Sequence, residues 1–391
     1  MAQRHLDPAE PVAGPAPTGD ALAGYLRAQA TEFLRALRLH RETGSGANGA
    51  GGSVDAARAL RRSARRISAS LHTFQSLLDA DWCEGMRPEL AWVSGTLAME
   101  HAYTARLERL LTALHRLSGS TALPGPSAGA AAGARADGAA GKHADSAAGS
   151  RAAGAAPVPQ RAAPGNAGSP THPTSTTERG NLTVGAAKAG ALLDRQLTLA
   201  RTRAHSTALQ ALGSSRFHAI ADKVAVLASE VPLTRSAATT DLRPLASAAN
   251  DRLTDAVTAL PLVTAGHPYN AAALIHGLSP DTVPHPQDAP WHQVRLLLRL
   301  HRYAREAVRG EPDGTSVVDL RLLSAGQALN RHRDASEAAA AAAQAARTPR
   351  IAPATAYALG VLHADQRHEV EAARFAFQQA WQKEAEAVST R

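Results

Sequence analysis

Residues 58–66 read Arg-Ala-Leu-Arg-Arg-Ser-Ala-Arg-Arg, and the spacing of the arginines predicts a helix with two distinct faces. One face would carry Arg58, Arg61, Arg62, Arg65 and Arg66, which recur at i, i+3, i+4, i+7 and i+8. The opposite face would carry Leu60, Ile67, Leu71, Phe74 and Leu78. Like charges one turn apart repel each other, so this helix favours an anionic partner over a merely solvated basic face.

A second basic segment, residues 292–303, reads His-Gln-Val-Arg-Leu-Leu-Leu-Arg-Leu-His-Arg-Tyr. At about 100° per residue, His292, Arg295, Arg299 and Arg302 fall on one stripe of a helix. A neighbouring stripe of leucines and Ala304 can pack against the rest of the protein. The two segments share this pattern, which indicates a duplicated unit.

The paired segments resemble the CHAD family, the conserved histidine α-helical domain. The family's second signature, His-x-x-Arg-Lys-x-x-Lys-Arg-x-Arg-Tyr-x-x-Glu, is matched by His292, Arg295, Arg299, Arg302, Tyr303 and Glu306. Leu296 and Leu300 replace basic residues of that signature. The first signature, His-x-x-Arg-Val-x-x-Arg-Arg-x-Arg, is met by Arg61, Arg65 and Arg66, whereas Arg58, Arg62 and Ser68 depart from it.

The resemblance implies an all-α fold of two helical bundles related by a pseudo-repeat, with a basic central channel between them. It also implies binding of inorganic polyphosphate and association with polyphosphate granules. The residues fit that chemistry, because guanidinium groups bind phosphate oxygens in pairs and keep their charge. Besides the two basic stripes, the candidate binding residues are His72, Arg216, Lys223 and His332. Each of these four could equally be an ordinary surface residue.

The composition is consistent with an anionic partner. The chain has 391 residues, with 42 Lys and Arg against 34 Asp and Glu, a formal charge of +8 and a pI near 10.2. Such a charge also permits nucleic-acid binding, although aromatic residues for stacking on bases make up only 4% of the chain. Cys83 is the single cysteine, so an intrachain disulfide is excluded and Cys83 is expected to pack as a small apolar residue.

The order along the chain predicts two helical halves separated by a linker. We expect a disordered N-terminus at 1–19, a first half at 20–118, a disordered linker at 119–180 and a second half at 181–388. The linker is dominated by Ala, Gly, Ser, Pro and Thr and has no aromatic residue. A first helix begins near residue 20, and further helices are expected at 54–79, 87–118, 181–212, 214–229, 242–260, 270–277, 290–309, 316–347 and 353–388.

Several function classes receive no support from the sequence. There is no signal peptide and no apolar run of eighteen residues, so a cytoplasmic protein without membrane insertion is expected. Neither a metal-binding motif, a cofactor motif nor the Glu-x-Glu-x-Lys signature of a triphosphate tunnel domain is present. We therefore expect a non-catalytic binding protein, with nucleic acid or another polyanion as the alternative ligand. The sequence leaves the oligomeric state open.

Overall fold

The described part of the protein is all-α, as predicted. The computed structural model describes residues 18–44, 50–119, 174–261, 274, 278, 285–309 and 319–389. In these ranges the only strand-like pairing is an isolated bridge between Leu78 and Leu233. The predicted disordered segments, 1–19 and 119–180, lie outside the described residues except at their ends.

Nine α-helices are present in the described ranges. They are α1 (Gly19–Gly44), α2 (Ala50–Thr73), α3 (Ala80–Ser118), α4 (Thr174–Leu212), α5 (Ser215–Ser229), α6 (Arg243–Thr258), α8 (Ala289–Arg309), α9 (Leu320–Ala346) and α10 (Pro353–Ser389). Short 3-10 helices cover Gln75–Leu77, Arg235–Ala238 and Pro286–Asp288. The helix predicted at 270–277 lies outside the described residues except for one helical residue, Leu274.

Several predicted helix boundaries were wrong. The helix predicted at 54–79 covers Ala50–Thr73 and is followed by the 3-10 helix at Gln75–Leu77. The helix predicted from residue 87 begins at Ala80, because the Asp79 side chain caps it by accepting a 2.8 Å hydrogen bond from the backbone N–H of Trp82. Pro88 therefore lies inside α3 rather than in its first turn. Helix α4 begins at Thr174 rather than at residue 181. The last seven residues of the predicted linker, 174–180, are therefore helical.

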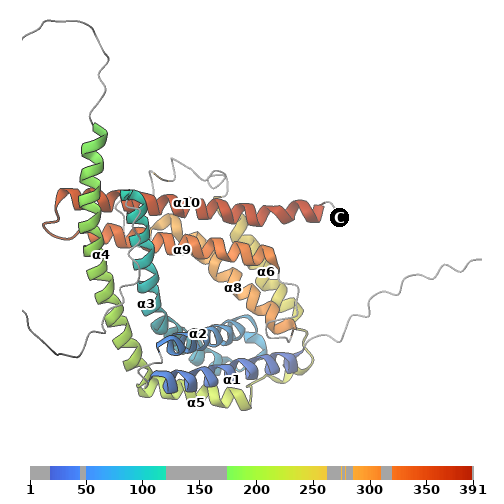
Figure 1. Ribbon diagram of the computed structural model, residues 1–391. Helices are drawn as coiled ribbons and strands as arrows, with labels where there is room; N and C mark the ends of the chain where they lie inside the picture. Colours follow the sequence, from blue (N-terminus) through green and yellow to red (C-terminus); the bar gives the residue numbers. More distant parts are fainter. Residues whose placement is uncertain are drawn as a thin grey trace, which may run out of the picture.

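The helices form two groups that are joined by a long antiparallel pair. Helices α1, α2 and α5 pack together at one end of the molecule, and α9 packs along α10 at the other (Figure 1). Helices α3 and α4 lie side by side and run from one group to the other. On the other side α8 contacts both α2 and α9. This arrangement brings the two predicted basic helices, α2 and α8, face to face.

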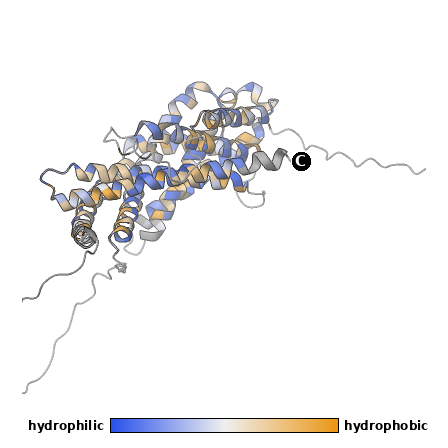
Figure 2. Cartoon of the chain, turned by 90° about the horizontal axis from the view of Figure 1, so that it is seen from above, coloured by the Kyte–Doolittle hydropathy of each residue, from blue (hydrophilic) through white to orange (hydrophobic). Residues whose placement is uncertain are grey.

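Three hydrophobic cores hold this arrangement, and they do not follow the predicted division of the chain. The first core joins α1, α2 and the start of α3 to Phe217 and Val224 of α5 and to Ala304 of α8. A second core lies between the end of α3, α4, α9 and α10, and a third between α6, α8, α9 and α10. Apolar residues accordingly line the interior faces of the helices (Figure 2). The residues before and after the linker thus share a core.

No helix in the described ranges is both long enough and apolar enough to cross a membrane. On helix α8, for example, apolar and charged residues lie on different faces. Trp291, Val294 and Leu298 are at most 3% exposed, whereas the arginines of α8 lie on another face.

Candidate functional site

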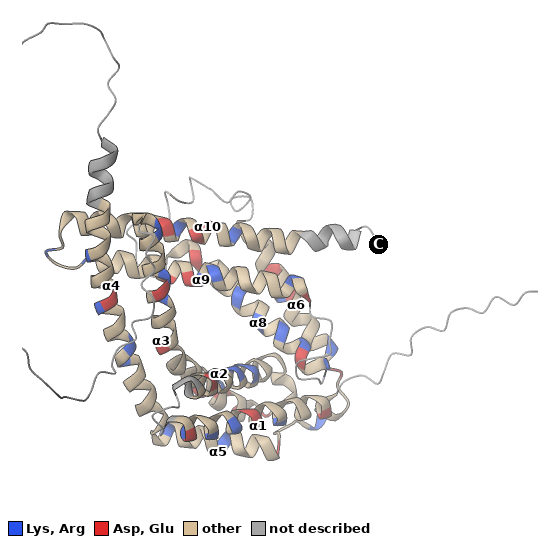
Figure 3. Ribbon diagram, viewed as in Figure 1, with Lys and Arg blue, Asp and Glu red and all other residues tan. Residues whose placement is uncertain are grey.

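Helices α2, α8 and α9 enclose a cavity of about 560 Å³ that we call the arginine cavity. Eight arginines contribute to its lining, against two carboxylates, Glu306 and Asp334. The arginines are Arg61, Arg62, Arg65 and Arg66 of α2, Arg295, Arg299 and Arg302 of α8, and Arg333 of α9. Figure 3 shows Lys and Arg positions along the ribbons of α2 and α8. The excess of positive charge makes this cavity the first candidate for a binding site.

The local sequence explains why the arginines face the cavity. On α2, Leu60, Ala64 and Ile67 are fully buried, which turns the arginine face away from the core. On α9, Gly326 lines the cavity, and a Cβ atom there would lie 3.4 Å from Leu298 and 4.0 Å from the Arg302 guanidinium. Both are ordinary van der Waals distances, so a methyl group would fit at position 326, whereas a longer side chain would take space from the cavity.

Glu306 neutralises one end of the arginine cavity. Its carboxylate accepts a 2.7 Å hydrogen bond from Nε of Arg66 and a 3.3 Å hydrogen bond from the hydroxyl of Tyr25. Burial alone would lower the pKa of Arg66, but the hydrogen bond to Glu306 and the charge of that carboxylate, helped by Tyr25 and Tyr303, together raise this pKa. The same surroundings, burial first and the Glu306 charge second, raise the pKa of the Tyr25 hydroxyl well above its usual range. This contact ties α1, α2 and α8 together and leaves Arg66 with an internal counterion.

Six of the other seven arginines of the cavity have no carboxylate partner among the described residues. Nε of Arg65 donates to the Ser94 hydroxyl at 2.9 Å, and Nη1 of Arg295 donates to the Asn330 side-chain oxygen at 3.3 Å. In the described part of the chain, no carboxylate forms an ion pair with Arg61, Arg62, Arg65, Arg295, Arg299 or Arg302. The Nε atoms of Arg61 and Arg295 are buried and make no hydrogen bond with the described residues.

The lowered pKa values of these arginines reflect their surroundings. Burial is the largest cause for Arg295, whose pKa falls to about 9, followed by the positive charges of Arg299 and Arg333. The pKa of Arg65 falls to about 10 through burial and then through Arg299 and Arg61. Repulsion of this kind is relieved by an anion between the guanidinium groups, because each positive charge then acquires a counterion.

The structure brings together seven of the arginines singled out from the sequence. Arg58 is not among them: it is exposed and pairs with Asp55 at 3.0 Å, one turn earlier on α2. The expectation that all five arginines of residues 58–66 share one functional face was therefore wrong for the first of them. Its counterpart in the second segment, His292, is half-buried and lies edge-on to the ring of His332, with 5.5 Å between ring centroids.

His332 belongs to a buried cluster rather than to the arginine cavity. It is 1% exposed and stacks on Trp291, and its Nε2 accepts a 3.3 Å hydrogen bond from Nε of Arg374. Burial lowers the pKa of His332 to about 4, although the nearby Asp288 carboxylate opposes this shift. We call this group the Asp288 cluster: it consists of Asp288, His332, Ser336, Arg367, Glu371 and Arg374.

The remaining candidates lie elsewhere. Arg216 pairs with Glu89 through contacts of 2.7 and 3.1 Å, and its guanidinium lies 4.2 Å from the centre of the Trp92 ring. Lys223 is exposed on α5. His72 lines an adjoining cavity, where its Nδ1 accepts a 3.0 Å hydrogen bond from Arg87 if the ring is neutral. None of these residues lines the arginine cavity.

Reasoning from sequence missed the contribution of α9. Arg333 and Asn330 line the arginine cavity together with Gly326, and these three residues share one face of the helix. The signal is the spacing of four and seven residues from Gly326, but Arg333 was not among the candidate binding residues. Its guanidinium pairs with Asp334, with 3.0 Å between Nε and Oδ1, and lies 3.8 Å from Glu337.

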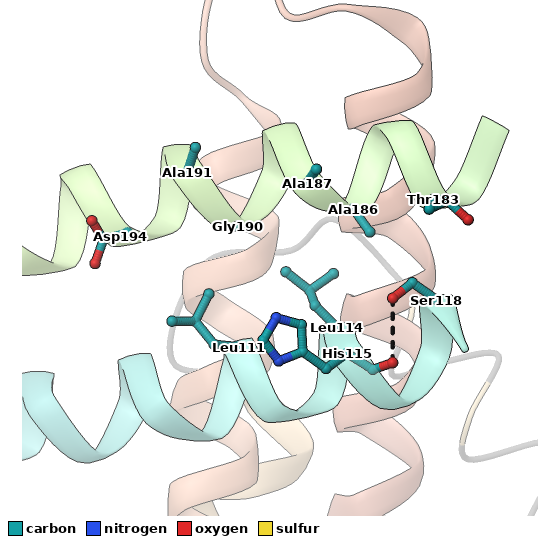
Figure 4. A pocket seen from close by; sticks show the side chains of 10 residues that line it. All are labelled: Leu111, Leu114, His115, Ser118, Thr183, Ala186, Ala187, Gly190, Ala191 and Asp194. Carbon is teal, nitrogen blue, oxygen red and sulfur yellow. Dashed lines mark hydrogen bonds between the residues drawn. The ribbon is translucent and has the colours of Figure 1, made fainter. Parts of the chain in front are cut away.

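A further cavity, of about 340 Å³, lies between the end of α3 and the start of α4 (Figure 4). Small and apolar residues such as Ala186, Gly190 and Leu114 line it, and the charged or titratable members are His115 and Asp194. The Ser118 hydroxyl donates a 3.2 Å hydrogen bond to the backbone carbonyl of His115. None of the described residues that line this cavity is an arginine. Among the described residues there is also no group of three or more His, Cys, Asp or Glu that could hold a metal ion.

The chain is similar to a known protein family and to a solved structure. A family model described as CHAD domain matches residues 28–343. A solved structure, described as "PptA from Streptomyces chartreusis", is 71% identical in sequence and superposes with a TM-score of 0.69. The match covers 94% of this chain and 100% of that chain. No curated protein matches the chain.

Proposed function

The chain belongs to the CHAD domain family, and we propose that it binds inorganic polyphosphate in the arginine cavity without converting it chemically. The observation that carries the proposal is the lining of eight arginines against two carboxylates. A linear polyphosphate presents repeated negative charges and phosphoryl oxygens, which guanidinium groups bind in pairs. The protein would hold the chain by an array of such contacts.

The proposal extends to the architecture of the site. Helices α2 and α8 would be the equivalent basic helices of two bundles related by a pseudo-repeat, and the arginine cavity would be part of a basic central channel between them. This is supported by the way both helices present arginines at spacings of three and four to the same cavity. In the cell, such binding would keep the protein in the cytoplasm on polyphosphate granules.

Nucleic acid is the alternative ligand, and the lining of the cavity favours polyphosphate over it. Tyr303 is the only aromatic residue among the described residues that line the arginine cavity. Proteins that hold single strands usually stack several bases on aromatic rings. A ligand made of phosphates alone needs no such surface.

A titration tests the proposal. Purified protein is titrated with polyphosphate of defined length at several salt concentrations, and with duplex DNA and single-stranded RNA as competitors at matched salt. We expect log K to fall with log salt by roughly 0.7–0.9 per neutralised phosphate, by analogy with nucleic acids. For several arginine contacts the total slope should be about −4 or steeper. An affinity that does not change with salt, or DNA that displaces polyphosphate at equal phosphate concentration, would contradict the proposal.

A further inference from the structure

A second cavity, of about 400 Å³, adjoins the arginine cavity and has a different chemical character. We call it the His72 cavity. Arg65 and Arg299 line both cavities, so the two meet at these guanidinium groups. The other residues that line the His72 cavity are Ser68, Ala69, His72, Arg87, Leu90, Ala91, Ser94, Gly95, Leu296 and Leu300.

The walls of the His72 cavity are largely apolar. Leu90 of α3 faces Leu296 and Leu300 of α8 across it. Leu296 is 47% exposed, which is high for a leucine beside buried arginines. Small residues of α3 keep the space open: a Cβ atom built on Gly95 meets no atom within 4 Å. A chain of phosphates alone has no use for such walls, because apolar surface offers a phosphate neither charge nor a hydrogen bond.

The positive charge of the His72 cavity lies at its edges. Arg299 makes no ion pair with the described residues, and Arg65 is bonded only to the neutral Ser94 hydroxyl. At the other edge Arg87 donates a hydrogen bond to Nδ1 of His72, which leaves Nε2 of the imidazole as a second donor. Donors at two edges and apolar walls between them match a molecule with a phosphoryl group on a non-polar body.

We propose that the His72 cavity binds an organic phosphate of nucleotide size. Its phosphoryl groups would lie on Arg65 and Arg299, and its non-polar body against Leu90, Leu296 and Leu300. The volume is within the range of small-molecule sites, about 300–1,000 Å³. A flat base could also stack on a guanidinium plane, which is a favourable contact for arginine. Because Arg65 and Arg299 serve both cavities, this ligand and polyphosphate compete for the same two side chains.

Adenosine triphosphate and inorganic tripolyphosphate are the probes that separate this proposal from simple attraction of anions. Both present three phosphates, but tripolyphosphate carries more negative charge and has no organic body. Charge alone therefore predicts tighter binding of tripolyphosphate. Tripolyphosphate also fits the site proposed for polyphosphate, the arginine cavity, so the order of the two Kd values does not locate the organic body. A selective loss of adenosine triphosphate binding when the His72 cavity is filled does locate it, with both Kd values measured by calorimetry without divalent cations.

Gly95→Phe tests where the organic body binds. The phenyl group would fill the His72 cavity from a helical position with free space, and no arginine is altered. The matched control is Gly85→Phe, on the same helix at another open position that lines neither cavity. We expect Gly95→Phe to raise the Kd of adenosine triphosphate by about tenfold or more, and Gly85→Phe to leave it unchanged. Neither variant should change the Kd of tripolyphosphate by a comparable factor.

Two results would overturn the proposal: an unchanged Kd for adenosine triphosphate in Gly95→Phe, or equal losses for both probes. If Gly95→Phe loses helicity, Leu296→Asn replaces it, because that exposed side chain can become polar without disturbing the core. Titration of long-chain polyphosphate in the same samples tests the proposed function separately. Its failure would leave the adenosine triphosphate result standing, since the proposal requires only Arg65, Arg299 and the apolar walls.

Discussion

Arginine side chains have different surroundings in the Asp288 cluster and in the arginine cavity. In the Asp288 cluster, Arg367 and Arg374 donate hydrogen bonds of 2.8 and 2.7 Å to the fully buried Asp288 carboxylate. Burial alone would raise the pKa of Asp288, but bonds and charge from His332 and Arg367 hold it well below the usual range of an aspartate. In the arginine cavity, eight arginines share Glu306 and Asp334.

The two regions therefore differ in the counterions available to their arginines, and not in the type of basic side chain. A buried arginine with its own carboxylate completes an internal network, and removing one partner leaves the other uncompensated. An arginine with only neutral partners keeps its capacity for an external anion. The following predictions test this distinction by removing charge from one region or the other.

The largest expected effect comes from Asp288→Ala. The substitution leaves Arg367 and Arg374 buried without their shared carboxylate, so we expect the free energy of unfolding to fall by about 3–5 kcal/mol. Urea unfolding followed by circular dichroism measures the loss. The control is Asp55→Ala, which removes an exposed ion pair with Arg58 and should change the stability by less than about 1 kcal/mol. Similar losses in the two variants would mean that the Asp288 cluster is not a structural centre.

Charge reversal in the arginine cavity should instead weaken binding. Arg295→Glu combined with Arg299→Glu removes two guanidinium groups and adds carboxylates beside the bound phosphates. We expect the Kd for polyphosphate to rise by about a hundredfold or more, which corresponds to about 3 kcal/mol. Helicity should be retained, as judged by circular dichroism.

The control for this reversal is Arg201→Glu combined with Arg203→Glu, at exposed positions of α4. Both double variants change the net charge by the same amount, but Arg201 and Arg203 do not line the arginine cavity. A comparable loss of affinity in the control would mean that the overall charge of the protein, and not an assembled site, governs binding.

Acid should weaken the folded state through the Asp288 cluster. The pKa of His332 is about 4 in the folded protein because of burial, against about 6.5 for an unfolded histidine. Between these values the unfolded chain binds a proton that the folded protein does not, so the free energy of unfolding falls as pH falls. From pH 7 to pH 5 we expect His332 to contribute a loss of about 2 kcal/mol.

Urea unfolding at the two pH values, compared between the wild type and His332→Phe, measures this contribution. Phenylalanine keeps an aromatic ring beside Trp291 but cannot be protonated. The variant should therefore have a shallower dependence on pH, whatever its stability at pH 7. Parallel profiles for the two proteins would show that His332 does not carry the acid sensitivity.

The smallest expected effect is a gain in stability. Arg61→Gln removes a positively charged guanidinium group. The pKa of Arg61 is lowered by burial and then by the positive charges of the neighbouring Arg333 and Arg299. Without an anion in solution, relief of this repulsion should raise the free energy of unfolding by roughly 0.5 kcal/mol. Polyphosphate affinity should fall in the same variant. A loss of stability in chloride-only buffer of low ionic strength would contradict the view that Arg61 is uncompensated.

The sequence predicted the regular parts of the molecule well. The spacing of leucines and arginines in residues 58–66 and 292–303 identified two helices and the faces that they turn to the arginine cavity. Periodicity sufficed there because charged and apolar residues separate clearly around each helix. The start of α3 was harder to predict, since the capping role of Asp79 depends on local geometry.

Pairing between distant residues could not be predicted. Nothing in the sequence near His332 indicates that Asp288 and Arg374 surround it, because the three residues come together only when α8, α9 and α10 pack. The same limit applies to Arg333, whose face of α9 is determined by the close approach of Gly326 to Leu298. Spacing predicts which residues share a helix face, but only the packing of helices decides which face meets a cavity.

Uncompensated charge in the arginine cavity also has a practical consequence at the bench. Phosphate and sulfate ions in a buffer will occupy such a cavity by mass action, and they will stabilise the fold as any ligand of the native state does. Melting temperatures measured in phosphate and in chloride should therefore differ, and a polyphosphate Kd measured in phosphate buffer will be too high. The difference between the melting temperatures in the two buffers would thus measure how far buffer anions occupy the arginine cavity.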